Sequence, residues 1–194
     1  MIERKKRGRL QLVLLAAVFF GPVLIAWLLY EPSGNTPTGE TTANGELLTP
    51  VPLVPDANLR VAREDQDSPY PGRWTLVVHA GADACAASCR QALYETRQVR
   101  KALGKEDRRV QRILFLDSTA PLDPAVAAEH PGLLVFAADG ALAQEFLAAA
   151  APDNAGDVYL IDPLGNLIMR FPAGLGMKGI HRDLKKLLTI SHIG

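Results

Sequence analysis

The residues of this chain best suited to chemistry are its two cysteines, Cys85 and Cys89, which lie four positions apart. They follow an apolar segment typical of a β-strand, Trp74 to Ala80, and stand at the start of a helical pattern, Cys89 to Leu103. A thiol at a helix N-terminus faces unpaired backbone N–H groups and the positive end of the helix dipole, and both favour the thiolate. Because positions i and i+4 share a helical face, the two sulfurs are expected to form a disulfide or to hold a soft metal ion such as Cu(I).

Two less reactive interpretations of the pair stay open. Free cysteines are often small buried hydrophobes, and an exported chain permits a structural disulfide. However, a bridge between Cys85 and Cys89 closes so short a loop that it removes little entropy from the unfolded chain. A zinc site is disfavoured because it needs four ligands and the sequence offers one cysteine pair. Redox or Cu(I) chemistry is therefore the favoured prediction, and it requires sulfurs that can be reached from solvent.

A dithiol can be oxidised and reduced with no other group present. We expect Cys85, in the loop, to be the attacking sulfur and Cys89 to be the resolving one. Of the four histidines, His79 at the predicted strand end is the candidate third ligand for Cu(I), although histidines at strand ends are more often structural. The other three are expected to be surface or capping residues: His130, His181 and His192.

The N-terminus predicts where the thiols are located. Residues 1–9 carry five basic side chains and one acid, Glu3, and no charged residue occurs between Leu12 and Tyr30. Such a stretch is long enough to cross a hydrocarbon core of about 30 Å, and the basic flank keeps the N-terminus in the cytoplasm. We therefore predict a cytoplasmic flank at 1–9 and a transmembrane signal anchor at 10–30. A cleavable signal peptide is the alternative, but the run ends in large residues instead of a small-x-small cleavage site.

The remainder of the chain divides into a tether and a globular domain. Residues 31–69 are rich in Pro, Gly and Thr and predict an extended tether, whose second half, Leu47 to Leu53, is apolar enough to lie along the domain edge. Removing Glu3 and the five N-terminal bases from 21 acidic and 21 basic residues leaves 20 and 16, a net charge of −4. That balance argues against a nucleic-acid partner. Residues 70–194 are long enough for one hydrophobic core.

The predicted elements of residues 70–194 alternate in type. After the first strand and helix, we expect strands at 110–117, 133–137, 158–161 and 167–171, and helices at 125–130, 141–150 and 180–190. Asp162-Pro163-Leu164-Gly165-Asn166 predicts a tight turn between the last two strands. This order indicates an α/β, thioredoxin-like three-layer sandwich with an N-terminal transmembrane helix, in which the first two strands are parallel neighbours.

The anchor, the tether, the fold order and the C-x-x-x-C pair together resemble the Sco family, most closely a divergent bacterial branch. The most specific marks are Cys85-x-x-x-Cys89 and the run from Asp157 to Asn166. The resemblance implies a protein of the bacterial inner membrane with a periplasmic domain that helps to build the copper centre of cytochrome c oxidase. It implies the copper-binding subunit of the oxidase, or other assembly factors, as partners.

Within that family the two thiolates bind copper or reduce the oxidase's own cysteines, and a histidine shortly before the Tyr-Leu-Ile-Asp strand completes the copper site. This sequence departs from the pattern, because residues 151–159 contain no histidine. They also lack a proline immediately before the strand, where thioredoxins keep one. The departure favours dithiol chemistry at Cys85 and Cys89 over copper binding. A Cu(I) carrier and a non-catalytic assembly scaffold remain the alternatives.

Overall fold

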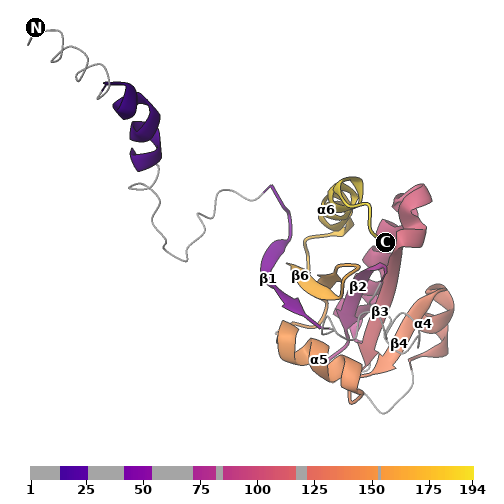
Figure 1. Cartoon of the computed structure of the whole chain (residues 1–194). Coiled ribbons are helices and arrows are strands. Elements are labelled where there is room, and N and C mark those ends of the chain that lie inside the picture. Colours follow the sequence, from indigo (N-terminus) through magenta and orange to yellow (C-terminus); the bar gives the residue numbers. More distant parts are fainter. Residues whose placement is uncertain (1–13, 26–41, 54–71, 82–84, 117–121, 153) are drawn as a thin grey trace, which may run out of the picture. The chain divides into compact units, whose positions relative to one another are not determined.

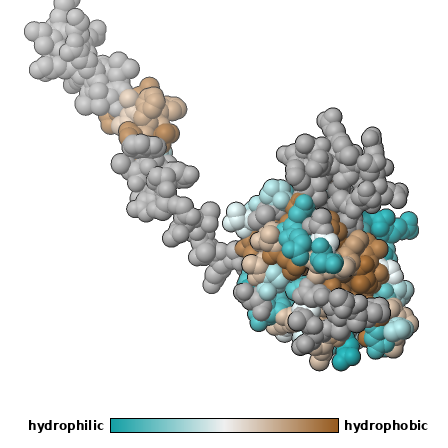
Figure 2. All heavy atoms as spheres, turned by 90° about the horizontal axis from the view of Figure 1, so that it is seen from below, coloured by the Kyte–Doolittle hydropathy of each residue, from teal (hydrophilic) through white to brown (hydrophobic). Residues whose placement is uncertain are grey.

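The computed structural model describes residues 14–25, 42–53, 72–81, 85–116, 122–152 and 154–194 (Figure 1). Two compact units, Met1–Thr41 and Thr42–Gly194, are considered separately. In the first, residues 14–25 are helical, and their large apolar side chains are mostly exposed (Figure 2). The predicted span at 10–30 extends beyond the described residues at both ends. Within the described ranges, no helix has both the length and the apolar character needed to cross a membrane.

A six-stranded mixed sheet forms the centre of the second unit, with the strand order β1-β6-β5-β2-β3-β4. The central strands β2 and β3 are parallel neighbours, as expected, and β2 is antiparallel to β5. The strands are β1 (Glu46–Pro52), β2 (Trp74–His79), β3 (Val110–Leu116), β4 (Leu133–Ala137), β5 (Val158–Ile161) and β6 (Asn166–Phe171).

Helices cover both faces of this sheet (Figure 1). On one face, α3 (Ala87–Ala102) and α6 (Met177–Ile190) pack over alternate residues of the central strands, and α4 (Pro124–Glu129) adds Val126 to the same core. On the other face, α5 (Ala141–Ala150) places Phe146 against Phe115 and Tyr159. A 3₁₀ segment, η1 (Gly104–Arg109), joins α3 to β3. The predicted three-layer, thioredoxin-like arrangement is confirmed.

The turn between β5 and β6 is built by one carboxylate, as its sequence predicts. Asp162 accepts hydrogen bonds from the backbone N–H groups of Leu164 (2.9 Å) and Asn166 (2.8 Å), and from the Asn166 amide. These bonds mimic a backbone turn and fix the hairpin register. Asp162 therefore has a structural role.

The N-terminal border of the domain differs from the prediction. Residues 46–52, assigned to a tether at 31–69, form edge strand β1, which pairs antiparallel with β6, and the compact unit begins at Thr42 instead of residue 70. The prolines at 50 and 52 argued against a strand, but an edge strand tolerates residues that lack an N–H group. Buried Asp183 of α6 fixes the start of this segment by accepting hydrogen bonds from the backbone N–H groups of Asn44 (2.7 Å) and Gly45 (2.8 Å).

Candidate functional site

The two cysteines are joined by a disulfide at the start of α3. Their sulfurs are 2.07 Å apart and their Cα atoms 5.0 Å apart. Cys85 precedes the helix and Cys89 lies in its first turn, because α3 begins at Ala87 instead of at Cys89. The structure thus brings together the two residues that the sequence singled out.

The backbone around Cys85 is unusual. Cys85 has a φ of +59°, in the left-handed region that residues with a Cβ seldom adopt. Such a conformation costs on the order of 1 kcal/mol and persists where surrounding contacts hold it. At the N-cap of α3, Ala86 supplies no side-chain cap, and its carbonyl accepts the N–H of Arg90 at 3.0 Å. Because the Ala86 side chain cannot accept a hydrogen bond, it does not compete with a Cys89 thiolate for the N–H groups at the positive end of the helix dipole.

The two cysteines were expected to be accessible to solvent, but the structure buries both of them. Cys85 is 3% exposed and Cys89 is fully buried, within the same apolar core as Leu76, Val78 and Val158. The i, i+4 spacing correctly indicated a shared helical face, but this face is turned toward the sheet. Exchange with a second thiol consequently requires a local opening of the segment around Cys85, the less buried of the two sulfurs.

The segment that precedes β5 lies directly against the disulfide-bearing turn. A Cβ atom built on Gly156 would lie 3.0 Å from the Cβ of Ser88 and 3.2 Å from the Ser88 carbonyl oxygen. One built on Gly81 would contact Ala155 at 3.7 Å. This is the segment in which the Sco resemblance implied a histidine, and here Gly156 lies against Ser88 while Ala155 lies beside Gly81.

Next to Gly156, the buried carboxylate of Asp157 anchors the same segment to β6. It accepts hydrogen bonds from Arg170 Nε at 2.8 Å and from the backbone N–H of Ala173 at 2.8 Å, and Arg170 Nη2 completes the ion pair. Partial burial lowers the pKa of Arg170, but the charge and hydrogen bond of Asp157 outweigh it and raise that pKa overall. Sequence reasoning marked Asp157 only as the first residue of the run that resembles the Sco family, and it did not single out Gly156, although a Gly-Asp pair directly before a strand was the available signal.

His79, the candidate third ligand, faces away from the sulfurs. Along β2, Val78 belongs to the core that contains the cysteines, whereas Val77 belongs to the core on the opposite face. By alternation His79 shares the face of Val77. Among the described residues, no group of three or more His, Cys, Asp or Glu side chains is arranged to hold a metal ion.

The other candidates lie away from the disulfide or serve other contacts. His130 is buried beside Arg112, with 3.5 Å between His130 Nδ1 and Arg112 Nη1, whereas His192 is exposed. Arg97 and Arg100 of α3 donate hydrogen bonds to the backbone carbonyls of Glu129 and Asp107.

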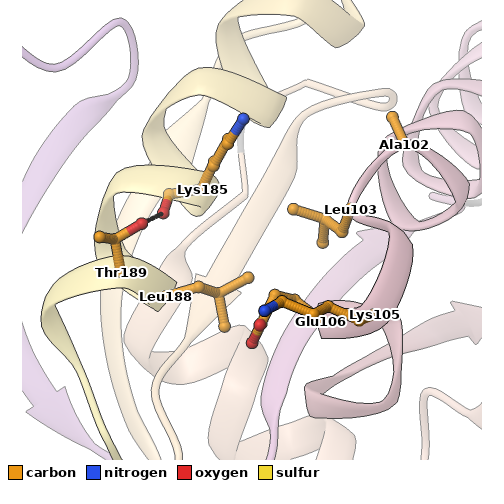
Figure 3. Close-up of a pocket in the computed structure, with 7 residues that line it drawn as sticks. All are labelled: Ala102, Leu103, Lys105, Glu106, Lys185, Leu188 and Thr189. Atoms are coloured by element: carbon orange, nitrogen blue, oxygen red, sulfur yellow. Dashed lines mark hydrogen bonds between the residues drawn. The ribbon is translucent and has the colours of Figure 1, made fainter.

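A pocket of about 420 Å³ lies at a different place in the domain (Figure 3). It is formed where the end of α3 and η1 face α6, and Leu103 and Leu188 point into it between Lys105 and Lys185. Its lining contains no cysteine, histidine or aspartate. It therefore offers no group that takes part in thiol chemistry, and the disulfide remains the candidate site.

Comparison with protein families adds to this geometry. The model of a family described as "transmembrane-like, thioredoxin-like, C-terminal domain" matches residues 74–191. The chain belongs to this family. A second model, of the transmembrane-like N-terminal domain, matches residues 3–31, where the sequence predicts the anchor. No curated protein matches this transmembrane-like, thioredoxin-like chain.

Solved structures similar to this family member include Sco proteins. Apo Sco1 from Thermus thermophilus matches with a TM-score of 0.55 and 16% identity, over 77% of this chain and 99% of that chain. Yeast Sco1 matches with a TM-score of 0.52 and 15% identity, over 78% and 97% of the two chains. The copper-bound form of yeast Sco1 matches with a TM-score of 0.49 and 14% identity, over 77% and 90%. At these identities, the first two likenesses show a shared thioredoxin-like fold.

The close approach between Gly156 and Ser88 predicts a specific effect of substitution. Gly156→Ala is expected to lower the free energy of unfolding by about 2 kcal/mol more than Gly174→Ala does, because overpacking a tight contact costs about 1–3 kcal/mol. Gly174 is the matched control, since its φ of +90° is similar to the +101° of Gly156 and nothing lies within 4 Å of its added Cβ. Calorimetric unfolding of the oxidised full-length protein in detergent measures both losses. Equal losses would show that the Ser88 contact is easily relieved.

Proposed function

We propose that this chain is a membrane-anchored thiol–disulfide exchange protein that supports maturation of the copper centre of a cytochrome c oxidase. The observation that carries the proposal is the Cys85–Cys89 disulfide, placed at the N-terminal end of α3, after β2, in a thioredoxin-like fold. Two sulfurs within bonding distance at the start of a helix have what dithiol exchange requires. The Sco resemblance of the sequence supports the oxidase as the destination.

The reaction begins with the reduced chain. The Cys85 thiolate attacks one sulfur of a disulfide in the target, which forms a mixed disulfide and releases one target thiolate. The Cys89 thiolate then attacks the Cys85 sulfur, which closes the Cys85–Cys89 bond and releases the second target thiolate. Two electrons pass to the target, whose thiolates take up the two protons lost by the cysteines. A dithiol protein is the class of donor that must reduce Cys85–Cys89 again.

We place this chemistry at the periplasmic side of a bacterial inner membrane. The match of residues 3–31 to a transmembrane-like domain and the apolar surface of residues 14–25 support an anchor. The basic flank of residues 1–9 supports a cytoplasmic N-terminus. The target is then the copper-binding subunit of the oxidase, whose cysteines must be reduced before copper is loaded.

Redox equilibrium of the full-length protein in detergent tests the proposal. The protein is equilibrated without oxygen in buffers of stepped glutathione ratio, its thiols are trapped by alkylation, and the oxidised fraction is determined by mass. We expect one two-electron transition within the series. Structural disulfides have potentials below about −300 mV and resist the glutathione pool. A bond that stays oxidised throughout the series would overturn the exchange function.

Burial of both sulfurs favours a second candidate, a non-catalytic assembly scaffold that contains a structural disulfide. Cys89 has no exposed surface and 3% of Cys85 is exposed, and such burial is typical of a structural disulfide. In the glutathione equilibrium, the disulfide of such a scaffold would stay oxidised at every ratio.

A Cu(I) carrier is the third candidate, in which copper is the cargo of the reduced chain. Once the bond is reduced, the two sulfurs lie close enough to share one soft ion. Anaerobic competition between the reduced protein and a Cu(I) chelator distinguishes this function. A carrier takes up one equivalent of Cu(I) and loses it in either cysteine-to-serine variant. His79→Asn is expected to leave that uptake unchanged, because His79 lies on the other face of the sheet.

A further inference from the structure

Four basic side chains converge at the junction of α3, α4 and β4, away from the disulfide. Arg112 of β3 faces the core below α3 and α4, with 2% of its surface exposed, and His130 at the end of α4 is 4% exposed. Arg97 and Arg100 approach from α3. Of these two, Arg97 is the nearer to Cys89 in sequence, eight residues beyond it, which is about 12 Å along the helix. The cluster is therefore separate from the thiol site.

The guanidinium groups of this cluster have no acidic partner among the described residues. Within the described part of the chain, no carboxylate forms an ion pair with Arg97, Arg100 or Arg112. Burial and the charges of Arg112 and Arg97 lower the pKa of His130, and they outweigh the opposite effect of Glu129. Burial and the charges of Arg100 and Arg97 lower the pKa of Arg112 to about 10. Like charges are thus held together at a cost in free energy.

Capping of α4 explains only part of the arrangement. Arg97 donates to the Glu129 carbonyl, and Arg112 Nη2 donates to the Pro131 carbonyl at 3.0 Å. These bonds place positive charge near a helix C-terminus, which is favourable. However, the Nε–H groups of both Arg97 and Arg112 are buried without a hydrogen-bond partner in the described structure. Leaving a buried donor without a partner is unfavourable, because its lost hydration is not replaced, so these groups call for an acceptor.

The third guanidinium group of the cluster, that of Arg100, lies beside Gly132. Arg100 bonds to the Asp107 carbonyl through Nε at 3.1 Å, and its Nη1 lies 3.4 Å from where a Cβ of Gly132 would be. A side chain at position 132 would therefore lie against the Arg100 guanidinium, and glycine avoids that contact. Planar guanidinium groups match the paired oxygens of carboxylates and phosphates.

We propose that Arg97, Arg100, Arg112 and His130 form a binding site for a single oxyanion group, phosphate or carboxylate, at the α3–α4–β4 junction. The buried Arg112 Nε–H is the inward donor, and the partly exposed Arg97 and Arg100 form the entrance. The site is independent of the thiol chemistry and would exist equally in an exchange protein, a copper carrier or a scaffold.

The test uses wild-type full-length protein in neutral detergent, with arginine labelled with ¹⁵N. Inorganic phosphate is added at constant ionic strength against chloride, and the Nε–H resonance of Arg112 is followed by NMR. We expect a saturable shift of this resonance and a higher unfolding temperature. A blocked tetraglutamate peptide forms a second arm. Response to phosphate alone indicates a free ion, and response to the peptide indicates a carboxylate presented by a polypeptide; both support an oxyanion site.

A matched pair of variants confirms the location. Arg100→Gln is expected to weaken binding of the responding ligand about tenfold, since it removes hydrogen bonds between two charged groups. Lys101→Gln removes one charge from the next, exposed position of α3 and is expected to leave affinity within twofold of the wild type. No saturable shift in the wild type, or equal losses in the two variants, would overturn the proposal and leave α4 capping as the role of the cluster.

Discussion

Cells whose only copy of this chain carries both Cys85→Ser and Cys89→Ser are expected to lose copper-dependent oxidase activity to the level of cells that lack the chain. The reason is chemical, because exchange needs one sulfur to attack and a second to resolve the mixed disulfide. A hydroxyl group can do neither. Oxygen consumption with a cytochrome c electron donor, measured in isolated membranes, gives the activity. Added copper should restore none of it if the missing step is reduction of the target's cysteines.

Folding must be separated from chemistry in this experiment, since both sulfurs are buried. A serine hydroxyl left buried without a partner costs about 1–3 kcal/mol, so the double alanine variant is made in parallel and chain abundance is measured. Ser88→Ala is the matched control, because this exposed residue lies between the cysteines and keeps the Cβ that contacts Gly156. It should retain activity. Full activity in the double variants would instead identify the chain as a scaffold.

The sequence predicted those features of the fold that depend on neighbouring residues alone. Periodicity predicted the order of strands and helices from Trp74 onward, and Asp162 predicted its own turn. It placed Leu47 to Leu53 along the domain edge but did not predict that this segment is a strand, because Pro50 and Pro52 are unfavourable inside a sheet although acceptable at an edge. Whether a segment is an edge strand depends on its partner, here β6, which lies more than a hundred residues later.

The candidate site shows the same limit. The spacing of Cys85 and Cys89 predicted that their sulfurs could bond, because that distance is set locally by one turn of chain. Their burial was not predicted, since it depends on which side of α3 the sheet covers. For the same reason His79, close to Cys85 in sequence, lies on the opposite face of β2 from the core that contains the sulfurs.

Asp157 connects the disulfide-bearing turn to the rest of the sheet. The adjoining Gly156 lies against Ser88, while the Asp157 carboxylate is held by Arg170 and by the Ala173 N–H. The position of the Gly156 backbone at the thiol site is thus fixed by an ion pair formed across two strands. A change at Asp157 is expected to affect the stability of the domain and the environment of the disulfide together.

Asp157→Ala is accordingly expected to lower the free energy of unfolding by about 3 kcal/mol, near the lower end for removal of one partner of a buried ion pair. The lower end applies because the Arg170 side chain is 24% exposed and can be partly solvated after the loss. Urea-induced unfolding of the oxidised full-length protein in detergent gives the value. The glutathione equilibrium of the variant should shift as well, because Gly156 is no longer held against the turn.

Glu46→Gln provides the control on the same arginine. Glu46 lies 3.7 Å from Arg170 Nη1 and is 57% exposed, and exposed pairs contribute only about 0–1 kcal/mol. Glu46→Gln should therefore lower the free energy of unfolding by a small fraction of what Asp157→Ala does, and it should not shift the glutathione equilibrium. If the two variants lose equally little, Asp157 does not hold the segment, and the position of Gly156 against Ser88 must be maintained by packing of the core alone.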